Sequence, residues 1–207
     1  IGGGPGGYVC AIRAAQSGLS VALVEKGQLG GVCLNRGCIP TKALAHTADV
    51  MDAASRAAEL GLIIPELRLD FARVMARKDR VVARLRGGVG LLLKRRKIDM
   101  FSGVGALAGT RAVEATASDG STTRIEARNI VIATGSEPVA PRMFGHDGVN
   151  MLTSDDVLKL KELPESVLIV GAGVIGCEFA SIFRTFGCEV TMVDIMPNIL
   201  PMVDEDV

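Results

Sequence analysis

A glycine-rich pattern occurs twice in this 207-residue chain, with a constant offset of 169 residues between the copies. The first copy begins Ile1-Gly2-Gly3-Gly4-Pro5-Gly6-Gly7 and the second begins Val170-Gly171-Ala172-Gly173-Val174-Ile175-Gly176. Each copy reaches an acid 23 positions after its first glycine, namely Glu25 and Asp194. This is the βαβ fingerprint of a dinucleotide site: the first glycine permits the turn, the second lets the backbone approach the pyrophosphate, and the third lets helix and strand pack closely. The repeat predicts an α/β fold with two Rossmann-like dinucleotide-binding units.

Two cysteines, Cys33 and Cys38, lie directly behind the first copy. A structural disulfide here would contribute little, because closing so short a loop removes only roughly 2 kcal/mol of chain entropy. On a regular helix the two side chains would lie about 140° apart, so they can bridge only where a helix is distorted or has not begun. Pro40 favours such a boundary, because proline is tolerated mainly in a first helical turn. Cys38 is therefore expected near a helix N-terminus, where the dipole favours the nucleophilic thiolate. The pattern predicts a redox-active pair; the alternative is two reduced core cysteines.

Composition excludes some classes of partner. Lys plus Arg and Asp plus Glu both number 23, which argues against nucleic acid or an anionic membrane as a partner. No apolar run is long enough to span a bilayer. Five cysteines at low density indicate a reducing compartment with one functional pair. The other cysteines are expected to be buried small hydrophobic residues: Cys10, Cys177 and Cys188.

Two helices are expected between the copies. Residues 41–60 are alanine-rich, and residues 71–97 carry apolar side chains at helical spacing. Gly87 and Gly88 could break the second helix.

Shorter elements follow these helices. A small β-hairpin insertion is expected within residues 104–126, around the turn signal Asp119-Gly120. Residues 129–135 are predicted to form a buried strand that ends in small residues. After a linker, Ser154 is expected to cap a helix whose first turn holds Asp155.

Two dinucleotide units and a thiol pair together predict a flavoenzyme. Hydride cannot pass simply from a nicotinamide to a disulfide, because disulfide chemistry proceeds through thiolate attack. Flavin exchanges hydride with nicotinamide and two electrons with a thiolate. We therefore expect FAD in the unit beside the cysteines, with Glu25 on its adenosine ribose, and NAD in the second unit. NAD is favoured over NADP because the carboxylate of Asp194 would accept hydrogen bonds from a free ribose hydroxyl and repel a 2′-phosphate.

Three segments resemble the flavoprotein disulfide reductases, most closely the dihydrolipoamide dehydrogenases. They are Cys33-Leu34-Asn35-Arg36-Gly37-Cys38-Ile39-Pro40-Thr41-Lys42, Ala133-Thr134-Gly135-Ser136-Glu137-Pro138, and residues 171–178. The resemblance implies that Cys33 exchanges with the substrate disulfide and that Cys38 lies against the flavin as a thiolate. It also implies that Lys42 and Glu178 pair near the flavin and nicotinamide rings.

The expected site residues fall into two groups, with no metal ligands among them. The catalytic set is Cys33, Cys38, Lys42 and Glu178. The cofactor-binding set is Gly2, Gly4, Gly7, Glu25, Lys26, Gly31, Val32, Cys33, Lys42, Gly105, Ala133, Thr134, Gly135, Ser136, Gly171, Gly173, Val174, Ile175, Gly176, Glu178 and Asp194.

The resemblance also sets expectations for the whole protein. It implies oxidation of dihydrolipoamide with NAD, with lipoyl groups of 2-oxo acid dehydrogenase or glycine cleavage complexes as partners. It implies a homodimer in which the other subunit supplies a catalytic histidine with a glutamate partner, and His46 and His146 match neither position. A reductase of another small disulfide and a non-catalytic flavin-binding module are the alternatives.

The expected division of the chain follows from the two units. Residues 1–141 are expected to form an FAD-binding domain that carries the redox disulfide, and residues 142–207 a linker and the first part of an NAD-binding domain. Only Ile1 precedes the first glycine and one βαβ unit cannot complete a sheet, so the sequence is expected to be truncated at both ends and incompetent alone. Localisation stays open between the bacterial cytoplasm and the mitochondrial matrix.

Overall fold

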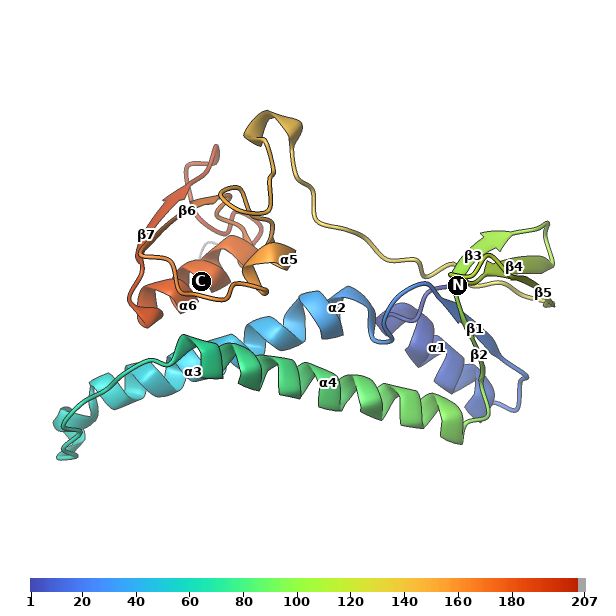
Figure 1. The fold of residues 1–207 in the computed structure, drawn as a ribbon, viewed down its shortest axis with the longest axis horizontal. Helices are drawn as coiled ribbons and strands as arrows, with labels where there is room; N and C mark the ends of the chain where they lie inside the picture. Colours follow the sequence, from blue (N-terminus) through green and yellow to red (C-terminus); the bar gives the residue numbers. More distant parts are fainter. Residues whose placement is uncertain (205–207) are drawn as a thin grey trace. The chain divides into compact units, whose positions relative to one another are not determined.

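The two glycine-rich repeats lie in different compact units of the chain. The computed structural model describes residues 1–204, and the chain divides into one unit of residues 1–39 and 80–139 and another of residues 40–79 and 140 onward. Two long helices, α3 (Cys38–Ser55) and α4 (Phe71–Arg95), contribute residues to both units. The elements are labelled in Figure 1.

The first unit contains a parallel strand pair and an antiparallel sheet. Its further elements are α1 (Pro5–Gln16), β1 (Ala22–Glu25), α2 (Gly31–Arg36), β2 (Asp99–Ser102), β3 (Val104–Leu107), β4 (Ala112–Thr116) and β5 (Thr122–Glu126). Strand β1 pairs in parallel with β2, and Ala22 lies opposite Asp99. On the other side of β1, the Gly2 amide donates to the Val24 carbonyl at 2.8 Å. The glycine turn therefore begins beside β1, at the edge opposite β2.

Helix α4 runs without interruption through Gly87 and Gly88, so the expectation that these residues break it is wrong. Val82, Val89 and Leu93 are buried in the core of the first unit, and Leu93 is 0% exposed. Full burial of such a side chain stabilises by about 1.5–3 kcal/mol, whereas a helical glycine costs about 1 kcal/mol. The buried apolar face therefore outweighs the two glycines.

The expected hairpin is confirmed in the first unit. Strands β4 and β5 pair antiparallel, and β3 adds to the other edge of β4. Gly120 has φ 84°, and Oδ1 of Asp119 accepts a hydrogen bond from the Ser121 amide at 2.8 Å. An aspartate followed by a glycine in the left-handed region thus closes the turn.

The buried strand expected at residues 129–135 is not formed. Within residues 1–204 this segment has no strand partner, and Val131 and Ile132 are 52% and 63% exposed. Its backbone pairs with one residue, because Ile1 donates to the Val131 carbonyl at 2.7 Å and accepts from the Ala133 amide at 2.8 Å. A ladder of one residue is too short to bury a strand.

The second unit contains the second glycine-rich repeat. Its further elements are η1 (Ala57–Leu60), η2 (Arg142–Phe144), α5 (Ser154–Val157), β6 (Ser166–Val170), α6 (Val174–Phe186) and β7 (Glu189–Val193). Strands β6 and β7 pair in parallel, and Ser166 lies opposite Glu189. Phe179, Ile182, Phe183 and Phe186 of α6 pack with Leu44 of α3 in a shared core.

Two local expectations in the chain need correction. The cap of α5 is Thr153 rather than Ser154: Oδ2 of Asp156 accepts from the Thr153 amide at 2.9 Å and from its hydroxyl at 2.6 Å. Of the three cysteines expected to be buried, Cys188 is buried, whereas Cys177 is partly exposed and Cys10 is exposed. Within residues 1–204, no helix has both the length and the apolar character that crossing a bilayer requires.

Candidate functional site

The first glycine turn leaves the start of α1 open to a ligand. Gly2 has φ 103°, and a Cβ there would lie 2.1 Å from the Ala133 carbonyl oxygen. A Cβ on Gly7 would lie 1.7 Å from the Gly2 carbonyl oxygen. Gly4 caps α1 without a side-chain hydrogen bond, and the first turn contains no acidic residue. No side chain of the first turn therefore neutralises the positive end of the helix dipole.

The carboxylate of Glu25 links the glycine turn to the loop that follows β1. Oε2 accepts from the Gly3 amide at 2.5 Å, and Oε1 accepts from the Gly27 amide at 2.7 Å. The acid thus holds the end of β1 beside the glycine turn, where the fingerprint places a ribose.

The second copy reproduces this geometry at the same offset. Gly171 has φ 109°, and a Cβ on Gly176 would lie 2.0 Å from the Gly171 carbonyl oxygen. Gly173 caps α6 without a side-chain hydrogen bond, and the first turn again contains no acidic residue. The following residues Val174 and Ile175 are exposed.

Asp194 matches Glu25 in its contacts. Oδ2 accepts from the Ala172 amide at 2.6 Å, and Oδ1 accepts from the Met196 amide at 2.8 Å. These backbone donors, the Ala172 amide first, hold the pKa of Asp194 below its ordinary value. The carboxylate is therefore charged at neutral pH.

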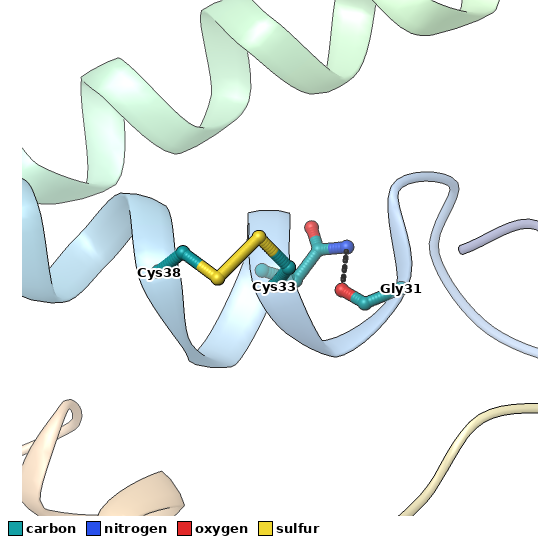
Figure 2. The surroundings of a disulfide bond; sticks show 4 residues. Gly31, Cys33 and Cys38 are labelled. Atoms are coloured by element: carbon teal, nitrogen blue, oxygen red, sulfur yellow. Dashed lines mark hydrogen bonds between the residues drawn. A yellow bond between two sulfur atoms is a disulfide. The ribbon is translucent and has the colours of Figure 1, made fainter. Parts of the chain in front are cut away.

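The cysteine pair spans a break between two helices. Helix α2 ends at Arg36 and α3 begins at Cys38, with Gly37 between them. Cys33 and Cys38 form a disulfide with a Cα–Cα distance of 4.7 Å, within the usual range for such bonds (Figure 2). The predicted helix start at Cys38 is confirmed, and it places this sulfur at the positive end of the α3 dipole.

Cys33 lines an apolar groove of about 550 Å³ in the first unit. Its walls come from α1, α2, the start of α3 and α4. They include Tyr8, Leu34, Ile39, Leu85, Leu92 and Arg95. Cys33 is therefore one wall residue of a mostly apolar groove.

Other predicted residues of the first unit gather near the glycine turn. A Cβ on Gly31 would lie 2.5 Å from the Cα of Gly4, and Val32 follows it in α2. Ala133 touches the turn at Gly2, whereas the next residues, Thr134, Gly135 and Ser136, are exposed.

Lys26 and Gly105 both contact other residues of the first unit. Lys26 is exposed and forms a 3.7 Å ion pair with Glu137. A Cβ on Gly105 would lie 2.9 Å from the side chain of Ile1 and 3.2 Å from that of Val24, so close packing favours a glycine there. A cofactor contact at Gly105 stays a prediction.

Lys42 and Glu178 both lie in the second unit and both are exposed. Within the described residues no ion pair joins them, and their pairing beside a bound cofactor stays a prediction. Lys42 follows Cys38 by four residues on α3, which places the two side chains on one face of the helix.

Neither histidine belongs to this site. His46 is exposed on α3, and Nε2 of His146 lies 2.8 Å from Oδ2 of Asp156. The hydrogen bonds from Thr153, and then that from His146, lower the pKa of Asp156 well below its ordinary value.

The sequence did not single out Asn35 or Arg86, although both contact the loop before α2 or its residues. Asn35 bonds the loop before α2, and Arg86 of α4 reaches both Gln28 and Asn35. Asn35 is one of two polar residues between the cysteines, the other being Arg36, and this position was the only signal for it in the sequence. No signal existed for Arg86, which comes from a helix 51 residues later.

Comparisons with known proteins agree with this geometry. The profile of the pyridine nucleotide-disulphide oxidoreductase family matches residues 1–207. The dihydrolipoyl dehydrogenase of Chlorobaculum parvum is 44% identical over 207 residues, and one from Bacillus subtilis is 41% identical over 209 residues. All of this chain is covered in both matches, with 44% and 45% of the relatives' own length. The chain thus spans less than half the length of these two relatives.

Solved structures show the same likeness. LpdA of Mycobacterium tuberculosis matches all of this chain and 46% of its own, with a TM-score of 0.93 and 29% identity. The HOCl-induced flavoprotein disulfide reductase RclA of Escherichia coli matches all of this chain and 43% of its own, with a TM-score of 0.81 and 33% identity. These matches confirm the predicted α/β fold with Rossmann-type dinucleotide units. The chain therefore belongs to the pyridine nucleotide-disulphide oxidoreductase family.

Proposed function

We propose that the protein oxidises dihydrolipoamide to lipoamide, with NAD as the final acceptor and FAD between the two. The observation that carries this proposal is the Cys33–Cys38 disulfide, which lies at a helix start directly behind a dinucleotide turn. Relatives named dihydrolipoyl dehydrogenase at 41–44% identity support this choice of substrate.

The first unit fits FAD. The α1 N-terminus has neither a side-chain cap nor an acidic first turn, so its amides suit a pyrophosphate. Gly2, Gly4 and Gly7 keep side chains away from that position, and Glu25 lies where a ribose would follow. Bound flavin would supply two-electron exchange with a thiolate on one side and with a nicotinamide on the other.

The second unit fits NAD by the same argument. The α6 N-terminus is likewise uncapped by side chains. The charged carboxylate of Asp194 can accept hydrogen bonds from a ribose with free hydroxyls, and it would repel the 2′-phosphate of NADP.

The substrate step is thiol–disulfide exchange at the cysteine pair. One thiolate of dihydrolipoamide attacks Sγ of Cys33, which breaks the Cys33–Cys38 bond and releases Cys38 as a thiolate. The second substrate thiol, deprotonated, then attacks the substrate sulfur of this mixed disulfide and releases Cys33. The substrate is oxidised by two electrons and the cysteine pair is reduced. The α3 dipole stabilises Cys38 as the leaving thiolate.

Lys42 and Glu178 complete the proposed catalytic set. An ammonium near a reduced anionic flavin would stabilise it, and a carboxylate would orient that ammonium. Both side chains are exposed, which leaves them able to approach a bound cofactor.

The proposal extends to the assembly. Lipoyl groups of 2-oxo acid dehydrogenase or glycine cleavage complexes are the proposed substrates in the cell. We propose a homodimer in which the partner subunit supplies the base that deprotonates the substrate thiol. The relatives described above come from bacteria, which favours the cytoplasm over a mitochondrial matrix.

A direct test is to assay the full-length protein with dihydrolipoamide and with reduced glutathione, each with NAD and with NADP, and in the opposite direction with oxidised glutathione and NADH or NADPH. We expect dihydrolipoamide to reduce NAD and reduced glutathione not to reduce it. The likeness to RclA favours, as the second candidate, a reductase of another disulfide. Disulfide-dependent oxidation of NADH or NADPH without dihydrolipoamide activity would select that candidate, and a preference for NADP would refute the cofactor assignment.

A further inference from the structure

Asn35 lies in the last turn of α2, two residues after Cys33, and its side chain contacts the loop before that helix. Its Nδ2 donates to the carbonyl oxygens of Gly31 at 2.9 Å and Leu29 at 3.0 Å, and it lies 3.4 Å from that of Gln28. Figure 2 marks the bond to Gly31. A helix of six residues is too short to be stable by itself. Helix α2, and Cys33 with it, therefore depends on such contacts for its position.

The same loop is anchored on the first glycine turn. The Gly30 amide donates to the Gly3 carbonyl at 2.8 Å. Gly30 and Gly31 have φ values of 98° and 61°, and the backbone of Gly31 approaches that of Gly4 too closely for a side chain. The loop therefore links the cysteine helix to the dinucleotide turn, and Asn35 fixes the helix to the loop.

Arg86 of α4 supports Asn35 from its oxygen side. Nη1 of Arg86 donates to Oε1 of Gln28 and lies 3.4 Å from Oδ1 of Asn35. A cation beside the amide oxygen keeps the amide nitrogen turned toward the loop carbonyls. If the amide rotated, its oxygen would face those carbonyl oxygens instead.

We propose that Asn35 and Arg86 are positioning residues that hold Cys33 in place relative to the dinucleotide turn, and thereby set how readily the cysteine pair is reduced and exchanges electrons with the flavin. The identity of the flavin rests on the proposed function. The two residues act through α2 and through the loop of residues 28–31.

The test compares Asn35→Asp, Arg86→Met and Arg86→Lys in the full-length, flavin-loaded protein. Arg84→Met is the matched control, because Arg84 is exposed on α4 without a hydrogen-bond or ion-pair partner in residues 1–204. The first measurement is the dithiol–disulfide equilibrium of the cysteine pair in a glutathione redox buffer. The others are the long-wavelength thiolate–flavin absorbance after two-electron reduction, and kcat and KM for dihydrolipoamide.

We expect Asn35→Asp and Arg86→Met to shift the equilibrium constant by about fivefold or more, as expected for the loss of a hydrogen bond. Both should lower the absorbance and kcat with little change in KM. Arg86→Lys should recover part of each effect, because an ammonium can still donate to Gln28. Arg84→Met should match the wild type.

Wild-type equilibrium constants and absorbance in both Asn35→Asp and Arg86→Met would overturn the positioning role. If Asn35→Asp does not fold, the equilibrium constant and absorbance of Arg86→Met alone test the positioning role. If the wild type does not oxidise dihydrolipoamide, the proposed function fails. The glutathione equilibrium still judges the positioning role in that case, because it needs neither that substrate nor the flavin.

Discussion

Replacing Gly7 with alanine puts a methyl group at the third glycine of the first turn. The added Cβ would lie 1.7 Å from the carbonyl oxygen of Gly2 and 2.8 Å from its carbonyl carbon. Both are backbone atoms of the turn itself, so no flexible side chain can move to make room. Gly7 lies in α1 without a positive φ, so the cost is steric alone.

The size of the effect follows from this overlap. Inserting a methyl group into a closely packed site costs about 1–3 kcal/mol, and contact with backbone favours the upper part of that range. If FAD binds only to the undistorted turn, this cost raises the Kd for FAD by about 5- to 150-fold. Gly176→Ala, whose Cβ would lie 2.0 Å from the Gly171 carbonyl oxygen, should weaken NAD by the same factor and leave FAD unchanged.

The control is Gly87→Ala in α4, where an added Cβ meets nothing within 4 Å. This change should leave both Kd values unchanged and stabilise the protein by about 0.4–1 kcal/mol, because alanine restricts the unfolded chain. The assay is titration of the flavin-free full-length protein with FAD, and of the flavin-loaded protein with NAD, followed by fluorescence. Equal FAD affinity in Gly7→Ala and Gly87→Ala would refute the steric argument. Loss of FAD binding in Gly176→Ala alone would reverse the assignment of the two cofactors.

Further predictions concern the thiols and two carboxylates. In the two-electron-reduced full-length protein, Cys38→Ser should lose the long-wavelength thiolate–flavin absorbance, whereas Cys33→Ser should keep it and lose lipoamide turnover; identical spectra would contradict the two roles. Asp194→Ala should weaken NAD by about 1.5–3 kcal/mol in calorimetric titrations, because ribose hydroxyls lose a charged acceptor. Since the pKa of Asp194 is lowered, wild-type NAD affinity should not change between pH 8 and pH 5, and a protonation-linked loss at pH 5 would oppose this assignment. The lowered pKa of Asp156 contributes stability above the unfolded pKa of about 3.9, and this is lost as pH falls toward the folded value. Asp156→Asn should therefore reduce the fall in urea stability between pH 5 and pH 3, and an unchanged pH profile would argue against the contribution of the Thr153 cap.

The repeat could be predicted from the sequence because the local backbone geometry requires a glycine at each of these positions. Gly2 and Gly171 share a positive φ, and Gly7 and Gly176 share a contact that excludes a Cβ. Such requirements involve residues a few positions apart, so they leave a fixed spacing in the chain. The helix start at Cys38 could also be predicted from a local requirement, because Pro40 is tolerated mainly in a first helical turn.

Predictions failed where distant packing decided the outcome. Gly87 and Gly88 do not break α4, because buried residues of the same helix outweigh their low helix propensity. Residues 129–135 have strand-like composition, but the backbone beside them is that of Ile1, the first residue of the sequence, and they form no strand within the described part of the chain. Propensity describes a segment, whereas burial depends on what the fold puts next to it.

The candidate site divides in the same way. The two dinucleotide turns, their acids Glu25 and Asp194, and the cysteine pair could be predicted from the sequence, because the contacts that require them lie within one βαβ unit or directly behind it. The packing of the helices forms the apolar groove that Cys33 lines and brings Arg86 to Asn35 across 51 residues of sequence. It also left Lys42 and Glu178 exposed and unjoined within residues 1–204. These facts depend on how helices pack, and the spacing of residues along a chain does not encode side-chain contacts between separate helices.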